Sequence, residues 1–156
     1  MDKLNLKKQE HSYLKLKHLV TMIVFGVILT IVTIVLLFNH AEYWKILIVN
    51  AAIGLFCLGV VLYQTAAFKR FSYAMDDYGL YINSGVIWQK KIIVPRNRVQ
   101  HTDVSQGPLE RKYKLAELTV HTAGTRNASV KLPGIKYNLA EQLRESLAFE
   151  ESNDAV

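Results

Sequence analysis

The stretch LVTMIVFGVILTIVTIVLLF, at residues 19–38, decides the fold because its 20 residues include no charged side chain. As a helix rising about 1.5 Å per residue it would be about 30 Å long, which matches the hydrocarbon core of a bilayer. A second uncharged stretch, ILIVNAAIGLFCLGVVLYQTAAF, occupies residues 46–68. A chain of 156 residues has too little other sequence to bury two such helices in a soluble core. The sequence therefore predicts two membrane-spanning helices.

A cleaved signal peptide is the alternative interpretation of the first stretch, since basic residues precede it. However, the stretch is longer than the usual hydrophobic region of a signal peptide, and a cleavage site needs small residues. The bulky residues Phe38, Asn39 and His40 stand at that place instead. We therefore expect the segment to be retained.

The basic residues predict how the two helices are oriented. Residues 1–18 contain five lysines, and Lys69 and Arg70 follow the second stretch, whereas the linker at residues 39–45 contains one basic residue. Cytoplasmic segments next to membrane spans carry the excess of Lys and Arg. Both termini are therefore expected in the cytoplasm and the linker outside, with Trp44 at the outer interface.

Small and polar side chains recur on one face of each predicted helix. In an antiparallel pair of helices, opposed positions have residue numbers that add to a nearly constant value. Three pairs satisfy this condition: Thr33 with Asn50, Thr30 with Gly54, and Gly26 with Cys57. Small residues let helix backbones approach closely, and Thr33 could hydrogen-bond the Asn50 amide. Alternatively, the same faces would serve a dimer or a partner protein.

After residue 68 the pattern changes to short runs of β-branched and aromatic residues separated by turn signals, which is typical of an all-β domain. The expected strands cover residues 70–75, 79–83, 86–94, 99–105, 115–122 and 128–132. A helix follows, with Asn138 as its N-cap and Glu141 completing a capping box. The recurring Leu139, Leu143 and Leu147 give this helix one apolar stripe. The sequence thus predicts a curved sheet or barrel of six or seven strands, closed by the C-terminal helix.

The chain is therefore expected to contain four segments. These are a basic cytoplasmic tail at 1–18, a two-helix hairpin at 19–68, the β domain at 69–150 and a disordered acidic tail at 151–156. Because leucines alternate with lysines in the first segment, it is expected to be either an amphipathic surface anchor or a solvated basic leader.

Several motifs of the β domain resemble a known family. They are IVPRNRVQ at 93–100, VSQGPLER at 104–111, LAEL at 115–118, HTAG at 121–124 and LPG at 132–134. Together they are similar to the bacterial pleckstrin-homology-like (PH-like) domain of YdbS-like membrane proteins, over about residues 19–150. One departure is Lys114, which stands where a glycine is common and puts the local turn in question.

The resemblance implies a PH-like barrel tethered to the cytoplasmic side of the bacterial inner membrane by two helices, without an established enzyme activity. Members often occur beside a larger relative that carries repeated copies of the domain. The resemblance therefore makes a membrane complex, with a role in envelope homeostasis, a reasonable expectation.

Candidate catalytic and metal-binding residues are few. His101, Asp103 and Ser105 alternate along a predicted strand and share one face, but a Ser-His-Asp site needs a geometry that neighbouring strand positions do not normally supply. With His121 added, two histidines without a carboxylate at a recognisable spacing do not predict a metal site. Cys57 is the only cysteine, which excludes an intrachain disulfide. We expect no catalytic residues, no cofactor and no metal.

The expected partners are a related membrane protein, or a second copy of this chain, and the lipid bilayer. The candidate partner-binding loop consists of Gln106, Gly107, Pro108, Leu109, Glu110 and Arg111. Alternatively, the net charge of +6 serves contact with anionic lipid. The candidate lipid contacts are Lys69, Arg70, Lys90, Lys91, Arg96 and Arg98. The simpler explanation of these basic residues is topology and solubility. Nucleic acid is not expected, because no RNP-type motif is present.

Overall fold

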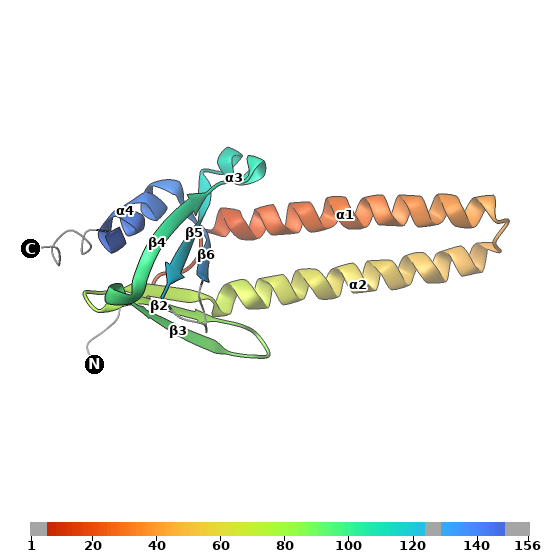
Figure 1. The fold of residues 1–156 in the computed structure, drawn as a ribbon. Helices are drawn as coiled ribbons and strands as arrows, with labels where there is room; N and C mark the ends of the chain where they lie inside the picture. Colours follow the sequence, from red (N-terminus) through yellow and green to blue (C-terminus); the bar gives the residue numbers. More distant parts are fainter. Residues whose placement is uncertain (1–5, 124–128, 149–156) are drawn as a thin grey trace, which may run out of the picture. The chain divides into compact units, whose positions relative to one another are not determined.

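A computed structural model of the chain describes residues 6–123 and 129–148 (Figure 1). The chain divides into two compact units. Leu14–Ala66 forms a helical hairpin, and Met1–Tyr13 with Ala67–Val156 forms the β domain.

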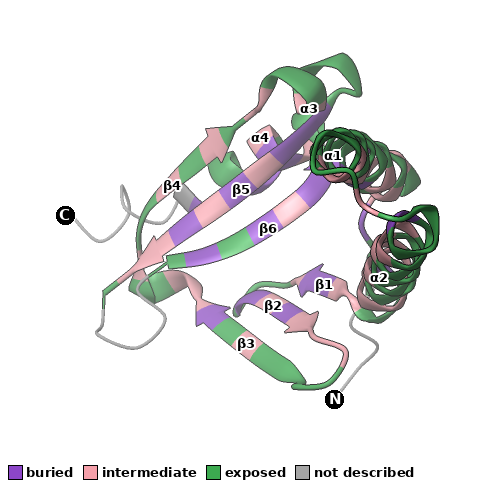
Figure 2. Ribbon diagram, turned by 90° about the vertical axis from the view of Figure 1, so that its right-hand side faces the viewer, coloured by how far each residue is buried: buried purple, intermediate pink, exposed green. Residues whose placement is uncertain are grey.

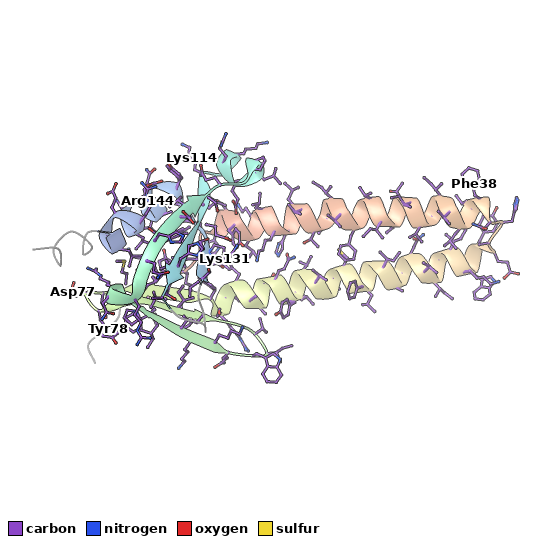
Figure 3. The ribbon with its side chains drawn as sticks, in the orientation of Figure 1. Phe38, Asp77, Tyr78, Lys114, Lys131 and Arg144 are labelled. Atoms are coloured by element: carbon purple, nitrogen blue, oxygen red, sulfur yellow. The ribbon has the colours of Figure 1, made fainter. Side chains whose placement is uncertain are left out.

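Two helices make up the hairpin. Helices α1 (His11–Phe38) and α2 (Tyr43–Arg70) contain 28 residues each and are long and apolar enough to cross a membrane. Most of their apolar side chains are exposed, and in Figure 2 the two helices, seen end-on, are mainly in the colour of exposed residues. Phe38 lies at the turn between them (Figure 3). A helix that is apolar all round requires an apolar surrounding. The predicted hairpin of two apolar helices is confirmed.

The β domain contains two three-stranded antiparallel sheets. The first has the order β1-β2-β3, with β1 at Ser72–Met75, β2 at Gly79–Ser84 and β3 at Lys90–Pro95. After one 3-10 turn, η1 (Arg96–Arg98), the second has the order β4-β5-β6, with β4 at Val99–Ser105, β5 at Leu115–Thr122 and β6 at Ser129–Lys136. The short helix α3 (Pro108–Lys112) joins β4 to β5, and α4 (Tyr137–Ala148) follows β6.

One apolar core joins both sheets to α4, and its buried residues form bands on the strands (Figure 2). On β5, Leu118 and Val120 are buried, whereas the intervening Thr119 is less so, because successive side chains of a strand point to opposite faces. Leu143 and Leu147 complete the core from α4. The predicted all-β domain with a closing C-terminal helix is confirmed.

The residues that precede α1 belong to the β domain. The backbone groups of Lys7 and Tyr73 exchange hydrogen bonds of 2.7 and 2.9 Å, so Lys7 adds a bridge to the edge of β1. The Gln9 side chain is buried and donates to the Pro133 carbonyl at 2.8 Å. Lys7 and Gln9 therefore satisfy backbone groups of both sheets, which the expected anchor or leader at 1–18 did not include.

Several predicted strand ends are wrong. The strand expected at 86–94 begins only at Lys90, because residues 85–89 form the connection between β2 and β3. The strand expected to end at residue 132 continues to Lys136 through a Pro-Gly pair. An edge strand tolerates proline, which lacks a backbone donor. The expected start of this strand, at residue 128, lies outside the described residues.

The start of the terminal helix is also corrected. Helix α4 begins at Tyr137, so Asn138 lies inside the helix and is not its N-cap. Glu141 does not complete a capping box, and its carboxylate instead contacts Arg144 at 2.7 Å. The pairing of β6 with β5 extends to Lys136 and therefore determines where the helix can begin.

The backbone conformation of Lys114 explains why glycine is common at this place in the family that the chain resembles. Its φ is 54°, in the left-handed region that glycine adopts without steric cost. The left-handed turn is thus present although a lysine occupies it. Lysine at this position carries a penalty of about 1–2 kcal/mol.

We therefore predict that Lys114→Gly stabilises the β domain by up to about 1 kcal/mol, because it removes the left-handed penalty. The matched control is Lys112→Gly in α3, which should destabilise by about 0.5–1 kcal/mol. Pulse proteolysis of the full-length chain in detergent, at increasing urea concentrations, measures both changes. Destabilisation by both variants would contradict the strain at Lys114.

Candidate functional site

The predicted partner-binding loop contains the single helical turn α3, which we call the knob together with the two residues before it. The Gln106 side chain donates to the Leu115 carbonyl at 2.6 Å, and the backbone N–H of Gly107 donates to the Glu110 carboxylate at 2.8 Å. Pro108 occupies the first turn of α3, where its missing N–H costs nothing. Leu109 projects outward with 45% of its surface exposed. All six predicted residues, 106–111, are therefore brought together, in a helical turn and not in an open loop.

A cleft of about 520 Å³ lies beside this knob. It is lined by Glu10, Ser12, Gln106, Arg111, Tyr113, Lys114, Leu115, Lys136, Tyr137 and Asn138. The Lys136 ammonium lies 3.6 Å from the Glu10 carboxylate across it. Hydrogen bonding to Glu141, together with the negative charge of that residue, raises the pKa of Tyr137, because the neutral hydroxyl is the donor of that hydrogen bond. The cleft thus combines aromatic surface with mixed charge.

A second candidate surface surrounds the loop between β2 and β3. Ile87 and Trp88 are 78% and 83% exposed at this loop, although both are large and apolar. A pocket of about 280 Å³ beside it is lined by Arg70, Ser72, Asn83, Ser84, Gly85, Gln89, Lys90 and Lys91. The Arg70 guanidinium donates to the Val86 carbonyl and so is held against the loop.

The predicted lipid contacts do not form one cluster. Arg70, Lys90 and Lys91 line the same pocket, but Lys69 is not among its lining residues. Arg96 and Arg98 lie in η1, at the other end of β3. At about 3.3 Å per residue that end is roughly 20 Å away along the strand. Half of the predicted set therefore shares one site.

The predicted packing face of the hairpin contains one polar contact between helices. Thr33 Oγ1 lies 3.1 Å from Asn50 Nδ2. Thr30 instead donates to the Gly26 carbonyl of its own helix at 2.8 Å. A Cβ added at Gly26 or Gly54 would have no atom within 4 Å, so neither glycine permits a close approach of backbones. Cys57 is half-buried.

Two further polar pairs of the hairpin escaped the sequence analysis. Gln64 donates to Thr21 at 2.8 Å, and Thr65 lies 3.3 Å from a ring nitrogen of His18. The residue numbers of both pairs add to nearly the same value as those of Thr33 and Asn50. Extending that rule to one residue before the first uncharged stretch would have found both pairs.

A cluster of two histidines and a carboxylate lies on the exposed face of the second sheet. His101 and Asp103 are exposed on β4, as expected for a polar outward face. His121 of β5 lies directly opposite His101 in the sheet. Ser105 is opposite Glu117 and outside this cluster. The strand alternation indicated the first two residues, but the cross-strand register that adds His121 was not predicted.

Two apolar helices joined to a PH-like β domain place the chain in the class of membrane proteins with a PH-like domain. Comparison with known proteins supports this class. The family model described as "Bacterial PH domain" matches residues 12–150, so the chain belongs to this family. The chain is 32% identical over 139 residues to the UPF0699 transmembrane protein YdbS of Bacillus subtilis (strain 168), covering 86% of each chain. The resemblance inferred from the sequence motifs is confirmed.

A larger relative also matches. The UPF0699 transmembrane protein YdbT of Bacillus subtilis (strain 168) is 28% identical over 97 residues, which is 62% of this chain and 20% of YdbT. No solved structure matches the chain. The family is that of a membrane protein with a bacterial PH domain, and it indicates no catalytic class.

The polar contact of the hairpin gives a prediction. In a Cys57→Ala background, the pair Thr33→Cys and Asn50→Cys should form an intramolecular disulfide in membranes, because the two side chains meet. The matched pair Val35→Cys and Ile48→Cys lies at the same depth but on exposed faces, and should remain reduced. Mobility on non-reducing gels measures both. Equal crosslinking of the two pairs would contradict the observed packing face.

Proposed function

We propose that this chain is a non-catalytic module of the bacterial inner membrane that assembles with a related membrane protein through the surface around α3. Both termini lie in the cytoplasm in this proposal. The single observation that carries it is the knob: a turn fixed by two side-chain–backbone hydrogen bonds presents an exposed leucine beside a cleft with aromatic lining.

The chemistry of this surface suits a protein partner. Interfaces gain most of their affinity from a few apolar or aromatic anchors that fit pockets, surrounded by a polar rim. Leu109 is such an anchor, and Tyr113 and Tyr137 line the adjacent cleft. Because α3 is already ordered, little conformational entropy is lost when a partner binds it. Charges of both signs at the cleft, on Glu10 and Lys136, favour a partner with complementary charges.

A partner from the same family is supported by the size of the relatives. The match to YdbT covers only 20% of that protein, so the family includes members with much additional sequence. A small member and a large member would each contribute a PH-like domain to such a complex.

We predict that Leu109→Asp reduces recovery of the partner by about tenfold or more, since loss of a central anchor costs about 2 kcal/mol. The measurement is co-purification of PH-domain membrane proteins with the tagged full-length chain from native membranes, by quantitative mass spectrometry. Ile93→Asp is the matched control, because it places the same charge on a comparably exposed apolar residue of β3, outside both candidate surfaces. Unchanged recovery with Leu109→Asp would refute the proposal.

A second candidate function, contact with anionic lipid, is favoured by one specific observation. Exposed Ile87 and Trp88 stand beside a pocket that carries Arg70, Lys90 and Lys91. Tryptophan favours the membrane interface, and each cation near an anionic surface contributes about 1 kcal/mol. Arg70 is only two residues beyond the end of the second uncharged stretch. The covalent chain therefore keeps this guanidinium close to the headgroups.

We predict that Trp88 contacts the headgroup region of anionic bilayers. In a Trp44→Phe background, the fluorescence of Trp88 in nanodiscs should be quenched by headgroup-labelled lipid. This quenching should weaken as salt rises, because screening shortens the reach of the cations. Lys90→Glu with Lys91→Glu should reduce the quenching, whereas the control Lys112→Glu should not. The absence of quenching in anionic nanodiscs at low salt would eliminate this function.

A further inference from the structure

The exposed face of the second sheet gathers three side chains that are ordinary metal ligands. Residues directly opposite in an antiparallel pair have Cβ atoms about 4.5–5.5 Å apart, and diagonal neighbours remain within reach of long side chains. His101 and His121 are directly opposite, and Asp103 is two residues along the same strand as His101. Strand alternation and sheet register together thus place two imidazoles and one carboxylate on one patch.

The ligand atoms already lie near coordination spacing. Asp103 Oδ2 is 3.2 Å from His121 Nε2 and 3.8 Å from His101 Nε2. One ligand atom from each of the three residues lies within 4.8 Å of the others. With metal–ligand distances near 2.0–2.2 Å, two ligands of a tetrahedral zinc ion are roughly 3.3 Å apart. Side-chain rotations, without movement of the backbone, would therefore bring all three onto one ion.

We propose that His101, Asp103 and His121 bind a divalent transition-metal ion of the zinc class. Imidazole nitrogen suits Zn²⁺, Cu²⁺ and Ni²⁺, whereas Mg²⁺ and Ca²⁺ prefer all-oxygen sites. Three protein ligands leave the fourth position of a tetrahedral ion to water. This inference is independent of the assembly role proposed above and assigns no reaction to the ion.

The two imidazole rings must turn apart to receive the ion. They are now stacked, with centroids 4.1 Å apart and an angle of 12° between planes, so their Nε2 lone pairs do not converge on one point. The side chains of His101 and Asp103 are 63% and 65% exposed, so the main contact that opposes this rotation is the stacking itself. His121, at 28%, is the more fixed ligand.

Ser129 supplies the supporting hydrogen bond that metal-binding histidines usually have. Its hydroxyl lies 2.9 Å from Nδ1 of His121, and the two residues are register partners in β5 and β6. When Nδ1–H donates to this hydroxyl, the lone pair of His121 is on Nε2, the nitrogen that faces Asp103. Ser129 is thus a positioning residue for the proposed site.

The same residues make a Ser-His-Asp chain, but the arrangement does not suit a hydrolase. The serine contacts Nδ1 of His121 and the carboxylate faces Nε2, which is the reverse of the catalytic triad. Neither cleft described above includes these residues. A catalytic triad does not need His101, whereas a metal site uses it as a further ligand.

The test uses the full-length chain in detergent, without a histidine tag, and Zn²⁺ in competition with a chromogenic chelator. One equivalent should bind, and Co²⁺ in its place should give the visible absorption of a tetrahedral site. His101→Gln, Asp103→Asn and His121→Gln should each weaken Zn²⁺ binding by tenfold or more. Ser129→Ala should weaken it by about tenfold, as loss of a supporting partner does.

The matched control is His40→Asn, which removes a histidine from the linker between the helices and should leave Zn²⁺ affinity unchanged. Asparagine tolerates the φ of 54° at this position. Thermal unfolding without metal establishes that each variant is folded. Failure of the wild-type chain to bind Zn²⁺, or equal binding by the wild-type chain and His121→Gln, would overturn the proposal.

Discussion

An uncharged stretch of 20 residues in hydrocarbon must satisfy every backbone N–H and C=O within itself, because no water is available to do so. The helix meets this requirement, and the rest of the architecture depends on it. The short linker forces the second helix to run back beside the first. Side chains that face outward must then be apolar or satisfy their polar atoms within their own helix, as Thr30 does with the Gly26 carbonyl, and other polar side chains pair between the helices. Thr33 with Asn50 and Thr21 with Gln64 follow this rule.

The β domain, in contrast, has to form an apolar core from few residues. Two three-stranded sheets and α4 contribute to one apolar cluster. Each small sheet has open edges, which are available for pairing with other chains unless something covers them. Lys7 pairs with the edge of β1, and Gln9 reaches the Pro133 carbonyl of β6. The segment before α1 therefore contributes to the β domain, although the hairpin separates it in sequence from the rest of that domain.

The sequence predicted what depends on local pattern. The ends of β4 and β5 agree with the predicted residues 99–105 and 115–122. Apolar and polar residues alternate from Ala116 to His121 in β5, and the Gly-Pro pair at 107–108 marks the end of β4. The order of the elements and the position of the candidate loop at 106–111 were also available from turn signals and motifs. The motifs indicated the family, and the glycine they usually contain is replaced by Lys114 without loss of the left-handed turn.

What escaped prediction depends on contacts between residues distant in sequence. Lys7 carries no strand signal of its own, and its bridge exists because Tyr73 offers an unpaired edge. The extension of β6 to Lys136 is imposed by its partner β5, against the local Pro-Gly signal. The basic residues separated into two groups because β3 is extended, so charges six residues apart in sequence are far apart in space.

The histidine cluster shows how register, more than residue type, determines the chemistry of a sheet. A shift of one residue between β4 and β5 would turn His121 to the opposite face and into the core. Its neighbour Val120 is fully buried, so the apolar core itself holds the register. The pairing of His121 with Ser129 on β6 extends the same constraint across the third strand. Packing of the buried face thus fixes the strand register, and that register places His101, Asp103 and His121 close together on the exposed face.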